Sequence, residues 1–142
     1  MSNPKSAIDV ARKKVITCDP DEGLPSLAKK MVDHWISSIL VIEKGKPVGI
    51  VTDGIIFRLI AQKRNPLNII AKEVMVSPVY TIHANTTLKE TKAQFLKSKV
   101  NRLAIVDDEG KLVGIISKKD VNRQAAYSHA ERMLKRRHEI RD

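Results

Sequence analysis

The stretch Gly114-Ile-Ile-Ser-Lys-Lys-Asp120, together with the preceding Leu112 and Val113, predicts a buried strand that runs directly into a helix. Ser117 suits the N-cap position, and Asp120 would lie in the first helical turn, near backbone N–H groups that lack helical partners. A sugar or a phosphate could bind there, because a hydroxyl and free amides favour an anion and a carboxylate accepts two hydrogen bonds from a ribose diol. On its own, however, the heptapeptide is more simply explained as a capped helix with a solvated Asp120.

The surroundings of this stretch occur twice in the chain. Gly49-Ile-Val-Thr52 lies 65 residues before Gly114-Ile-Ile-Ser117, and it likewise precedes a helical segment. Thr17 and Thr81 each follow an expected strand start, and they are 64 residues apart. The one-residue difference falls in a turn, where an insertion is tolerated. A period of this length indicates a duplicated small domain, so we expect two similar halves packed face to face. The matching segments are helices at 24–34 and 88–99, strands at 39–42 and 103–106, and turns at 43–47 and 107–112.

Hydrophobic periodicity and turn residues predict the remaining elements. The helix at 24–34 continues an apolar face to Trp35, which we expect to pack in the core or at an interface. The last helix meets no Gly or Pro after Ser117, so it can run towards the C-terminus with its far end exposed, frayed or resting on a partner subunit. Further strands are expected at 15–18, 47–51 and 79–82, a helix at 54–63, a short segment at 8–11 and a link between the halves at 67–76.

The composition narrows the class of protein. The chain has 142 residues, 42% of them hydrophobic, which is enough for one domain or two very small ones. No apolar run approaches the roughly 18 residues of a membrane span, and the N-terminus lacks an apolar signal region. The single cysteine, Cys18, cannot form an internal disulfide or a metal cage. We therefore expect a cytoplasmic protein without membrane contact, in which Cys18 is a small, unreactive strand residue.

The net charge of +10 indicates an attraction to phosphate groups. This charge is distributed unevenly, because basic residues concentrate in residues 130–142 and in Arg12-Lys13-Lys14. Basic tails of this kind are more often solvated helix faces than grips for nucleic acid. The charge alone does not identify which phosphate compound binds.

These motifs give the chain a strong resemblance to a tandem pair of CBS (cystathionine-β-synthase) domains, also called a Bateman module, over about residues 8–126. The resemblance rests on Gly49-Ile-Val-Thr52, on Met75-Val-Ser-Pro-Val79, on residues 102–114 and on Ser117-Lys-Lys-Asp120. It implies an α+β fold of two pseudo-twofold-related repeats, each a small sheet of about three strands packed with two helices. We place repeat 1 at residues 8–66, repeat 2 at residues 67–126 and a basic C-terminal helical tail at residues 127–142.

The resemblance also implies an adenosine-ligand cleft between the repeats, or two such clefts. In the cleft that uses the second motif, Asp120 would bind the ribose hydroxyls and Ser117 would lie near the phosphate or the ribose. The first repeat would surround the adenine with its backbone, and basic residues would face the phosphates, because Arg suits a phosphate fork. The resemblance also implies roles for other residues of this cleft. They are Val15, Ile16 and Thr17 around the adenine, Ala11 and Lys14 at the entrance of the cleft, Ile36 and Ser37 in its wall, and Asn101, Arg102 and Lys119 near the phosphates.

The first repeat departs from the family pattern at one position. Three residues after Thr52 the chain has Ile55 where the second repeat has Asp120, so the ribose anchor is missing. Asp53 does not replace it, because two residues on a helix turn the side chain about 200° away. We expect one good site, and a second cleft that binds weakly or binds something else, with Thr52 also explained as an ordinary helix cap. That weaker cleft would be lined by Thr52, Val79, Tyr80 and Val100.

Nothing in the sequence supports catalysis. The four histidines, at 34, 83, 129 and 138, lack metal-ligand spacing, and there is no Cys-x-x-Cys, Gly-x-Ser-x-Gly or P-loop motif. We expect a stand-alone regulatory module, without a catalytic cofactor, that binds AMP, or else ADP or ATP, in the cleft and signals to a client protein. S-adenosylmethionine ranks lower, because it is cationic and Lys14, Arg102 and Lys119 would repel it.

Two further hypotheses stay open. One is a nucleic-acid-binding module in which Lys135-Arg136-Arg137 and Arg12-Lys13-Lys14 follow a phosphate backbone, although the interleaved aromatic residues of single-strand binders are missing. The other is a purely structural dimerisation module. Proteins of the resembled family typically pair through their helical faces into a flat disk of four repeats, so the resemblance implies a homodimer.

Overall fold

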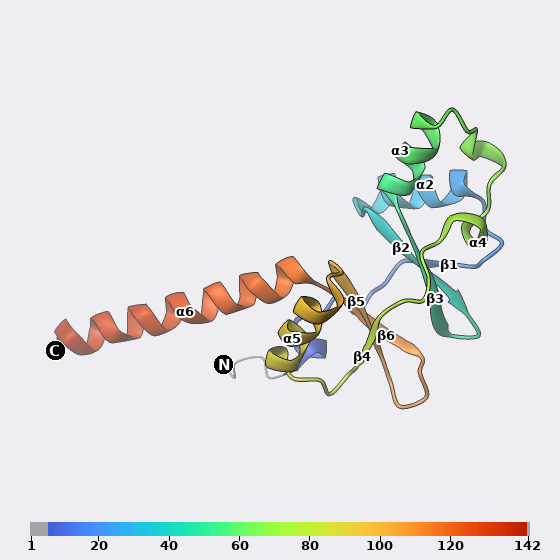
Figure 1. Ribbon diagram of the computed structural model, residues 1–142. Helices are drawn as coiled ribbons and strands as arrows, with labels where there is room; N and C mark the ends of the chain where they lie inside the picture. The colour runs from blue at the N-terminus through green and yellow to red at the C-terminus, as the bar shows by residue number, and fades with distance from the viewer. Residues whose placement is uncertain (1–5, 142) are drawn as a thin grey trace. The chain divides into compact units, whose positions relative to one another are not determined.

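The computed structural model describes the backbone of residues 6–141, and the side chains of these residues apart from 125–128 and 135–141. The described chain forms two compact units, each with its own small sheet (Figure 1). The first unit contains residues 14–80 and 108–112. The second unit contains residues 6–13, 81–107 and 113–141.

The first unit is a three-stranded sheet with helices packed beside it. Strand β1 (Thr17–Cys18) lies parallel to β2 (Ser38–Glu43), which pairs antiparallel with β3 (Lys46–Thr52) in the order β1-β2-β3. Leu24, Leu27 and Met31 lie on one side of α2 (Leu24–His34) because their spacing matches the helical repeat, and they pack into the core. The unit also contains α3 (Asp53–Ala61), the 3-10 helix η1 (Pro66–Asn68) and α4 (Ala71–Val74).

The second unit repeats this architecture. Strand β4 (Thr81–His83) lies parallel to β5 (Arg102–Val106), and β6 (Leu112–Ser117) completes the order β4-β5-β6. Phe95 of α5 (Leu88–Ser98) and Val121 of α6 (Lys118–Arg141) pack against Leu103, Ile105 and Ile116 of the sheet. Ala7 of the short helix α1 (Ala7–Val10) is buried in the same core.

The start of each repeat belongs to the unit that holds the other repeat's sheet. We call these parts the crossing segments: residues 8–13 of repeat 1, in the second unit, and residues 67–80 of repeat 2, in the first unit. Arg12 follows α1 and precedes β1, yet it exchanges two backbone hydrogen bonds of 3.0 Å with Ile115 of β6 in the second unit. Val76 follows α4 and precedes β4, yet it exchanges backbone hydrogen bonds of 2.9 and 3.0 Å with Ile50 of β3 in the first unit. These crossing segments therefore tie each sheet to chain from the other repeat.

The crossing segments explain the glycine that starts both motifs. A Cβ atom at Gly114 would stand 3.2 Å from the carbonyl oxygen of Arg12 and from Ile8 Cδ1, and one at Gly49 would overlap the side chain of Met75. A larger residue would push the crossing segment away from the sheet. The glycines are therefore required by the close approach of another chain segment.

The structure confirms the expected fold class, with two small α+β repeats, and α2 has its expected bounds. The strands expected at 15–18 and 79–82 are shorter, as β1 and β4, and α3 begins at Asp53 and ends at Ala61. The expected link at 67–76 contains α4 and most of η1. Of the two places expected for Trp35, the core is wrong, because the residue is 95% exposed, and an interface stays a prediction. Trp35 instead ends α2 in the left-handed conformation, with φ 54°, as Lys99 ends α5.

Candidate functional site

The turn between β6 and α6 has the expected capped geometry. The backbone N–H of Asp120 donates a 3.0 Å hydrogen bond to Ser117 Oγ, so Ser117 caps the helix. The N–H of Lys118 donates to the carbonyl oxygen of Asn101 over 2.8 Å. The backbone N–H groups of Lys118 and Asp120 thus already donate hydrogen bonds within the chain. The Ser117 hydroxyl accepts one of these bonds, and its own hydrogen can still be donated to a ligand. A ligand at this turn would rely on side chains more than on these two amides.

The Asp120 carboxylate is the strongest hydrogen-bond acceptor of this turn. Its side chain is 37% exposed, and Oδ1 lies 3.9 Å from Nη1 of Arg123, which is itself 78% exposed. An ion pair this long between solvated groups contributes little free energy, so it does not hold the carboxylate away from a ligand. Asp120 can therefore accept hydrogen bonds from two neighbouring hydroxyl groups.

The second unit brings several of the expected site residues together. The carbonyl oxygen of Asn101 accepts a hydrogen bond from the first residue of α6, Lys118. Ala11, in the crossing segment, lies beside Gly114 of β6. Lys119 is exposed in the first turn of α6, and Arg102 is partly exposed at the start of β5. The turn therefore combines one carboxylate with nearby basic residues.

The other expected adenine-side residues belong to the first unit. Val15, Ile16 and Thr17 are partly buried where the chain enters the edge strand β1, and Lys14 is exposed. The carbonyl oxygen of Thr17 already accepts a 2.9 Å hydrogen bond from Nζ of Lys30, a contact that sequence reasoning missed. In the same unit Ile36 packs against the core, and the carbonyl oxygen of Ser37 accepts from the N–H of Asp53 over 2.9 Å.

The first copy of the motif keeps the hydroxyl residue of the second but not its carboxylate. Thr52 is the N-cap residue of α3, but its side chain makes no cap hydrogen bond. Ile55, at the position of Asp120, is partly buried and packs against the core of the first unit. No carboxylate stands at that position, in agreement with the departure noted in the sequence. Of the other weaker-cleft residues, Val79 and the 49% exposed Tyr80 lie in the first unit, and Val100 packs on the core of the second.

Reactive and metal-binding groups are scarce in the part of the chain that the structure describes. Cys18 is buried, and burial, reinforced by the charge of Glu22, raises the pKa of its thiol to about 11. The described residues hold no group of three His, Cys, Asp or Glu side chains placed to bind a metal ion. None of the described helices has both the length and the apolar character needed to cross a membrane.

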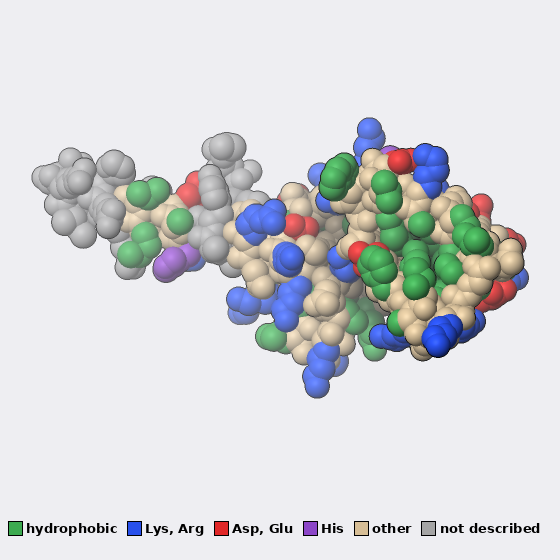
Figure 2. Space-filling model, turned by 90° about the horizontal axis from the view of Figure 1, so that it is seen from above, with side chains coloured by type: hydrophobic (Ala, Val, Ile, Leu, Met, Phe, Trp, Pro, Cys, Tyr) green, Lys and Arg blue, Asp and Glu red, His purple; other side chains and the backbone are tan. Residues whose placement is uncertain are grey.

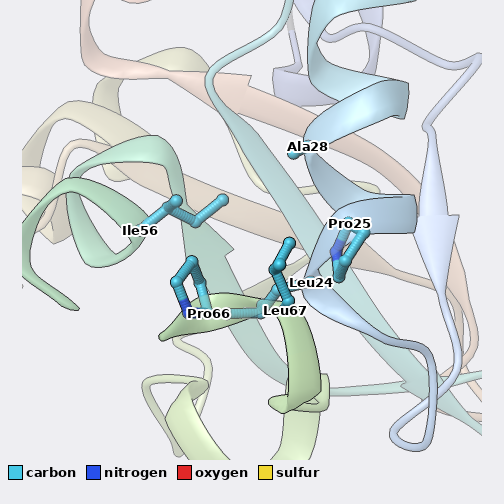
Figure 3. Close-up of a pocket in the computed structure, with 6 residues that line it drawn as sticks. All are labelled: Leu24, Pro25, Ala28, Ile56, Pro66 and Leu67. Carbon is cyan, nitrogen blue, oxygen red and sulfur yellow. The ribbon is translucent and has the colours of Figure 1, made fainter. Parts of the chain in front are cut away.

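A small apolar cavity lies in the first unit between α2, α3 and η1 (Figure 3). Its volume is about 90 Å³, well below the several hundred Å³ typical of small-molecule sites. Sequence reasoning did not find it, although the helical spacing of Pro25 and Ala28 places both on one stripe of α2. The lining residues are Leu24, Pro25, Ala28, Ile56, Pro66 and Leu67.

Comparison with known proteins identifies similar sequences. A family model described as CBS domain matches residues 7–62 and again residues 71–127. An uncharacterized protein of Methanopyrus kandleri is 36% identical over 121 residues, which cover 84% of this chain and 62% of that protein. The chain therefore spans less than two thirds of the length of this relative.

Solved structures share the fold. A CBS domain pair in complex with methylthioadenosine and S-adenosyl-L-methionine matches with a TM-score of 0.76 and 25% identity, over 87% of this chain and 97% of that one. The protein CBSX2 in complex with AMP matches with a TM-score of 0.71 and 21% identity, over 87% of this chain and 98% of that one. The second likeness shows the fold alone.

Proposed function

Because the chain belongs to the CBS domain family, with two matched repeats, we propose that it is a regulatory module that binds an adenine nucleotide at the turn between Ser117 and Asp120. The observation that carries this proposal is the capped turn itself. It presents a partly exposed carboxylate three residues after a hydroxyl, whereas the first repeat has Ile55 at the equivalent position. One site per chain is therefore proposed, at Asp120, with at most weak binding beside Thr52.

Each part of the nucleotide has a matching chemistry in the proposed site. The Asp120 carboxylate accepts from the two ribose hydroxyls, and the Ser117 hydroxyl donates to the ribose or the phosphate. Lys119 and Arg102 attract the phosphate. The adenine side, with Lys14, Val15, Ile16 and Thr17, is proposed from the family resemblance alone. The Thr17 carbonyl oxygen already accepts a hydrogen bond from Lys30 Nζ within the first unit.

The order of candidate ligands follows from charge. AMP is proposed first, followed by ADP and ATP, because the basic residues at the site favour phosphate groups. S-adenosylmethionine, which is bound in one of the similar structures, is the next candidate despite its positive charge. Regulation then requires that the ligand bind two arrangements of the module with different affinities. The module is proposed to act as a homodimer on a client protein, with no catalytic step and no catalytic cofactor.

A second candidate function is binding to a nucleic-acid backbone. Helix α6 carries eight basic and three acidic residues, a net charge of +5 over 24 residues. Such a helix attracts polyphosphates through counterion release, without a defined pocket. The two functions differ in their dependence on salt, and this difference separates them experimentally.

Isothermal titration calorimetry tests the proposed function. AMP, ATP and S-adenosylmethionine are titrated into the wild type, Asp120→Ala and the control Asp53→Ala, which removes an exposed carboxylate from the first turn of α3. Charge-assisted hydrogen bonds contribute about 1.5–3 kcal/mol, so Asp120→Ala should lose roughly tenfold to a hundredfold in affinity while the control keeps it. No binding of any ligand, or equal binding to Asp120→Ala, would refute the proposal.

A further inference from the structure

Most of the positive charge of the chain lies in the second unit. The described residues of that unit include fifteen basic and six acidic ones, a net charge of +9. The first unit carries ten basic and nine acidic residues, a net charge of +1. Figure 2 shows Lys and Arg side chains gathered over the second unit beside α6. The second unit therefore attracts anions far more strongly than the first.

Helix α5 carries an exposed stripe of lysines. Lys89, Lys92 and the C-cap residue Lys99 follow one another at intervals of three and seven residues, so they lie on one side of the helix. All three are exposed, and none of them has an ion-pair partner among the described side chains. Helix α6 contacts α5 and adds the exposed Lys119 and Arg123, one turn apart. We call the surface made by these five residues the α5–α6 face.

The fold does not require this lysine stripe. Sixty-four residues before Lys89, Lys92 and Lys99, the first repeat has Pro25, Ala28 and Trp35. That repeat forms a sheet of the same strand order with the same pair of helices. Gathering like charges on one surface lowers the stability of a folded chain through self-repulsion. The stripe therefore indicates a partner whose negative charge offsets this repulsion.

Helix α6 extends the positive charge beyond the core of its unit. Val121 is buried in that core, whereas every described side chain in residues 129–134 is exposed. Six consecutive exposed residues cover all sides of a helix, so this part of α6 is solvated all round. Figure 1 shows α6 continuing well past the sheet of its own unit. The basic residues in this half of the helix are Arg132, Lys135, Arg136, Arg137 and Arg141.

The side chains of this surface favour a phosphate backbone over a membrane or an acidic protein. A helix that lies on a membrane needs a continuous apolar stripe, but the exposed Met133 and Leu134 are neighbours that point about 100° apart. The cores of protein interfaces are depleted in lysine and rich in aromatic side chains. The lysine stripe, in contrast, has Leu96 as its apolar member. Ammonium groups on flexible stems suit phosphates, which they bind as point charges.

Exposed aromatic rings are missing from the described side chains of the second unit, which favours a double strand. Proteins that bind single strands stack the bases on aromatic side chains. Among the described Phe, Tyr and Trp side chains of this unit there is Phe95 alone, and it is buried. A helix of about 10–12 Å diameter fits the major groove of B-DNA, about 12 Å wide. The deep, narrow major groove of double-stranded RNA does not admit it.

We propose that the α5–α6 face and the rest of helix α6 bind double-stranded DNA through its phosphates. The 24 residues of α6 span about 36 Å, close to one turn of the duplex. The helix lies along the major groove, and the lysines of α5 contact the phosphates beside it. Contacts of this kind carry no sequence information, so duplexes of different sequence bind equally. The inference rests on the second candidate function, to which it adds the surface and the kind of nucleic acid.

Two matched triple substitutions test the proposal by fluorescence anisotropy with a labelled DNA duplex of about 24 base pairs. The first removes the lysine stripe, and the control removes three exposed basic residues of the first unit, so the net charge changes equally. The variants are Lys89→Gln/Lys92→Gln/Lys99→Gln and Lys46→Gln/Arg58→Gln/Arg64→Gln. The stripe variant should bind at least about tenfold more weakly at 100 mM salt, with a log–log salt slope smaller by about 2–3, because each lost phosphate contact contributes about 0.9. The control should change affinity less than about threefold.

Every arm of this experiment can overturn the proposal. No duplex binding by the wild type at 50 mM salt refutes it, and equal losses in both variants would assign the attraction to overall charge. Tighter binding to a single strand of the same length, to phosphatidylserine vesicles or to polyglutamate would identify a different partner. All six substituted residues are exposed, so circular dichroism and urea midpoints should match the wild type. Calorimetry with AMP on the same variants reports nucleotide binding separately, because none of the six lies in the proposed nucleotide site.

Discussion

The backbone N–H of Asp120 donates a 3.0 Å hydrogen bond to the hydroxyl of Ser117, whereas Thr52, its counterpart in the first unit, makes no side-chain cap bond. Ser117→Ala should therefore lower the free energy of unfolding by about 1 kcal/mol, because a cap bond is lost. Thr52→Ala should lower it by less. Urea unfolding followed by circular dichroism measures both variants, and equal losses would show that the Ser117 cap contributes nothing specific.

The glycines under the crossing segments should not tolerate alanine. Gly114→Ala places a Cβ atom 3.2 Å from the Arg12 carbonyl oxygen, and Gly49→Ala places one into the Met75 side chain. Each substitution should cost about 1–3 kcal/mol of unfolding free energy, as overpacking usually does. Gly54→Ala is the matched control, because it lies in α3 and its Cβ would meet only Thr52 Oγ1 at 3.7 Å. That control should be neutral or slightly stabilising, since alanine favours a helix. A loss at Gly54 equal to that at Gly114 would argue against crowding as the cause.

The buried Cys18 thiol should make stability depend on alkaline pH. Burial raises its pKa from 9.0 to about 11, so between these values the folded chain holds a proton that the unfolded chain has lost. The contribution of this group to stability is complete below pH 9 and is lost as pH rises towards 11 and beyond. Wild type and Cys18→Ala are compared by urea unfolding at pH 8 and pH 10.5. Wild-type stability should fall more steeply between the two pH values, and parallel behaviour of the two proteins would contradict the raised pKa.

Salt separates nucleotide binding from binding to a nucleic-acid backbone. Affinity for AMP should fall by less than about tenfold between 50 and 200 mM salt, because only a few charges are screened. A backbone contact through α6 should weaken by about three to five orders of magnitude over the same range if six to ten phosphates are neutralised. Fluorescence anisotropy with a labelled single-stranded oligonucleotide and calorimetry with AMP give the two slopes. Tight, steeply salt-dependent oligonucleotide binding without AMP binding would favour the second candidate function.

Local patterns predicted the parts of the fold that depend on neighbouring residues. The apolar spacing of Leu24, Leu27 and Met31 marked α2, and the hydroxyl of Ser117 marked the start of α6, because both signals lie within one or two helical turns. The duplication indicated that two similar units would form. Ile55 likewise showed in advance that the first copy lacks a carboxylate.

Features that depend on contacts between distant chain segments could not be predicted from the sequence. The pairing of Arg12 with Ile115 joins residues about a hundred positions apart, and α1 is too short for a periodic signal. The spacing of Trp35 matched a buried helical face, but the left-handed cap at that residue ended the helix and left the side chain exposed. The bond from Lys30 to the Thr17 carbonyl has no local signature either.

A double-mutant cycle on the ribose tests the central claim most directly, that Asp120 holds the ribose hydroxyls of an adenine nucleotide. AMP and 2′-deoxy-AMP are titrated into the wild type and into Asp120→Ala. The account predicts that the wild type binds AMP about tenfold more tightly than 2′-deoxy-AMP, and that Asp120→Ala binds both equally, because the missing partner removes the coupling. If the two proteins discriminate between these ligands to the same degree, Asp120 does not contact the 2′-hydroxyl and the account of the site is wrong.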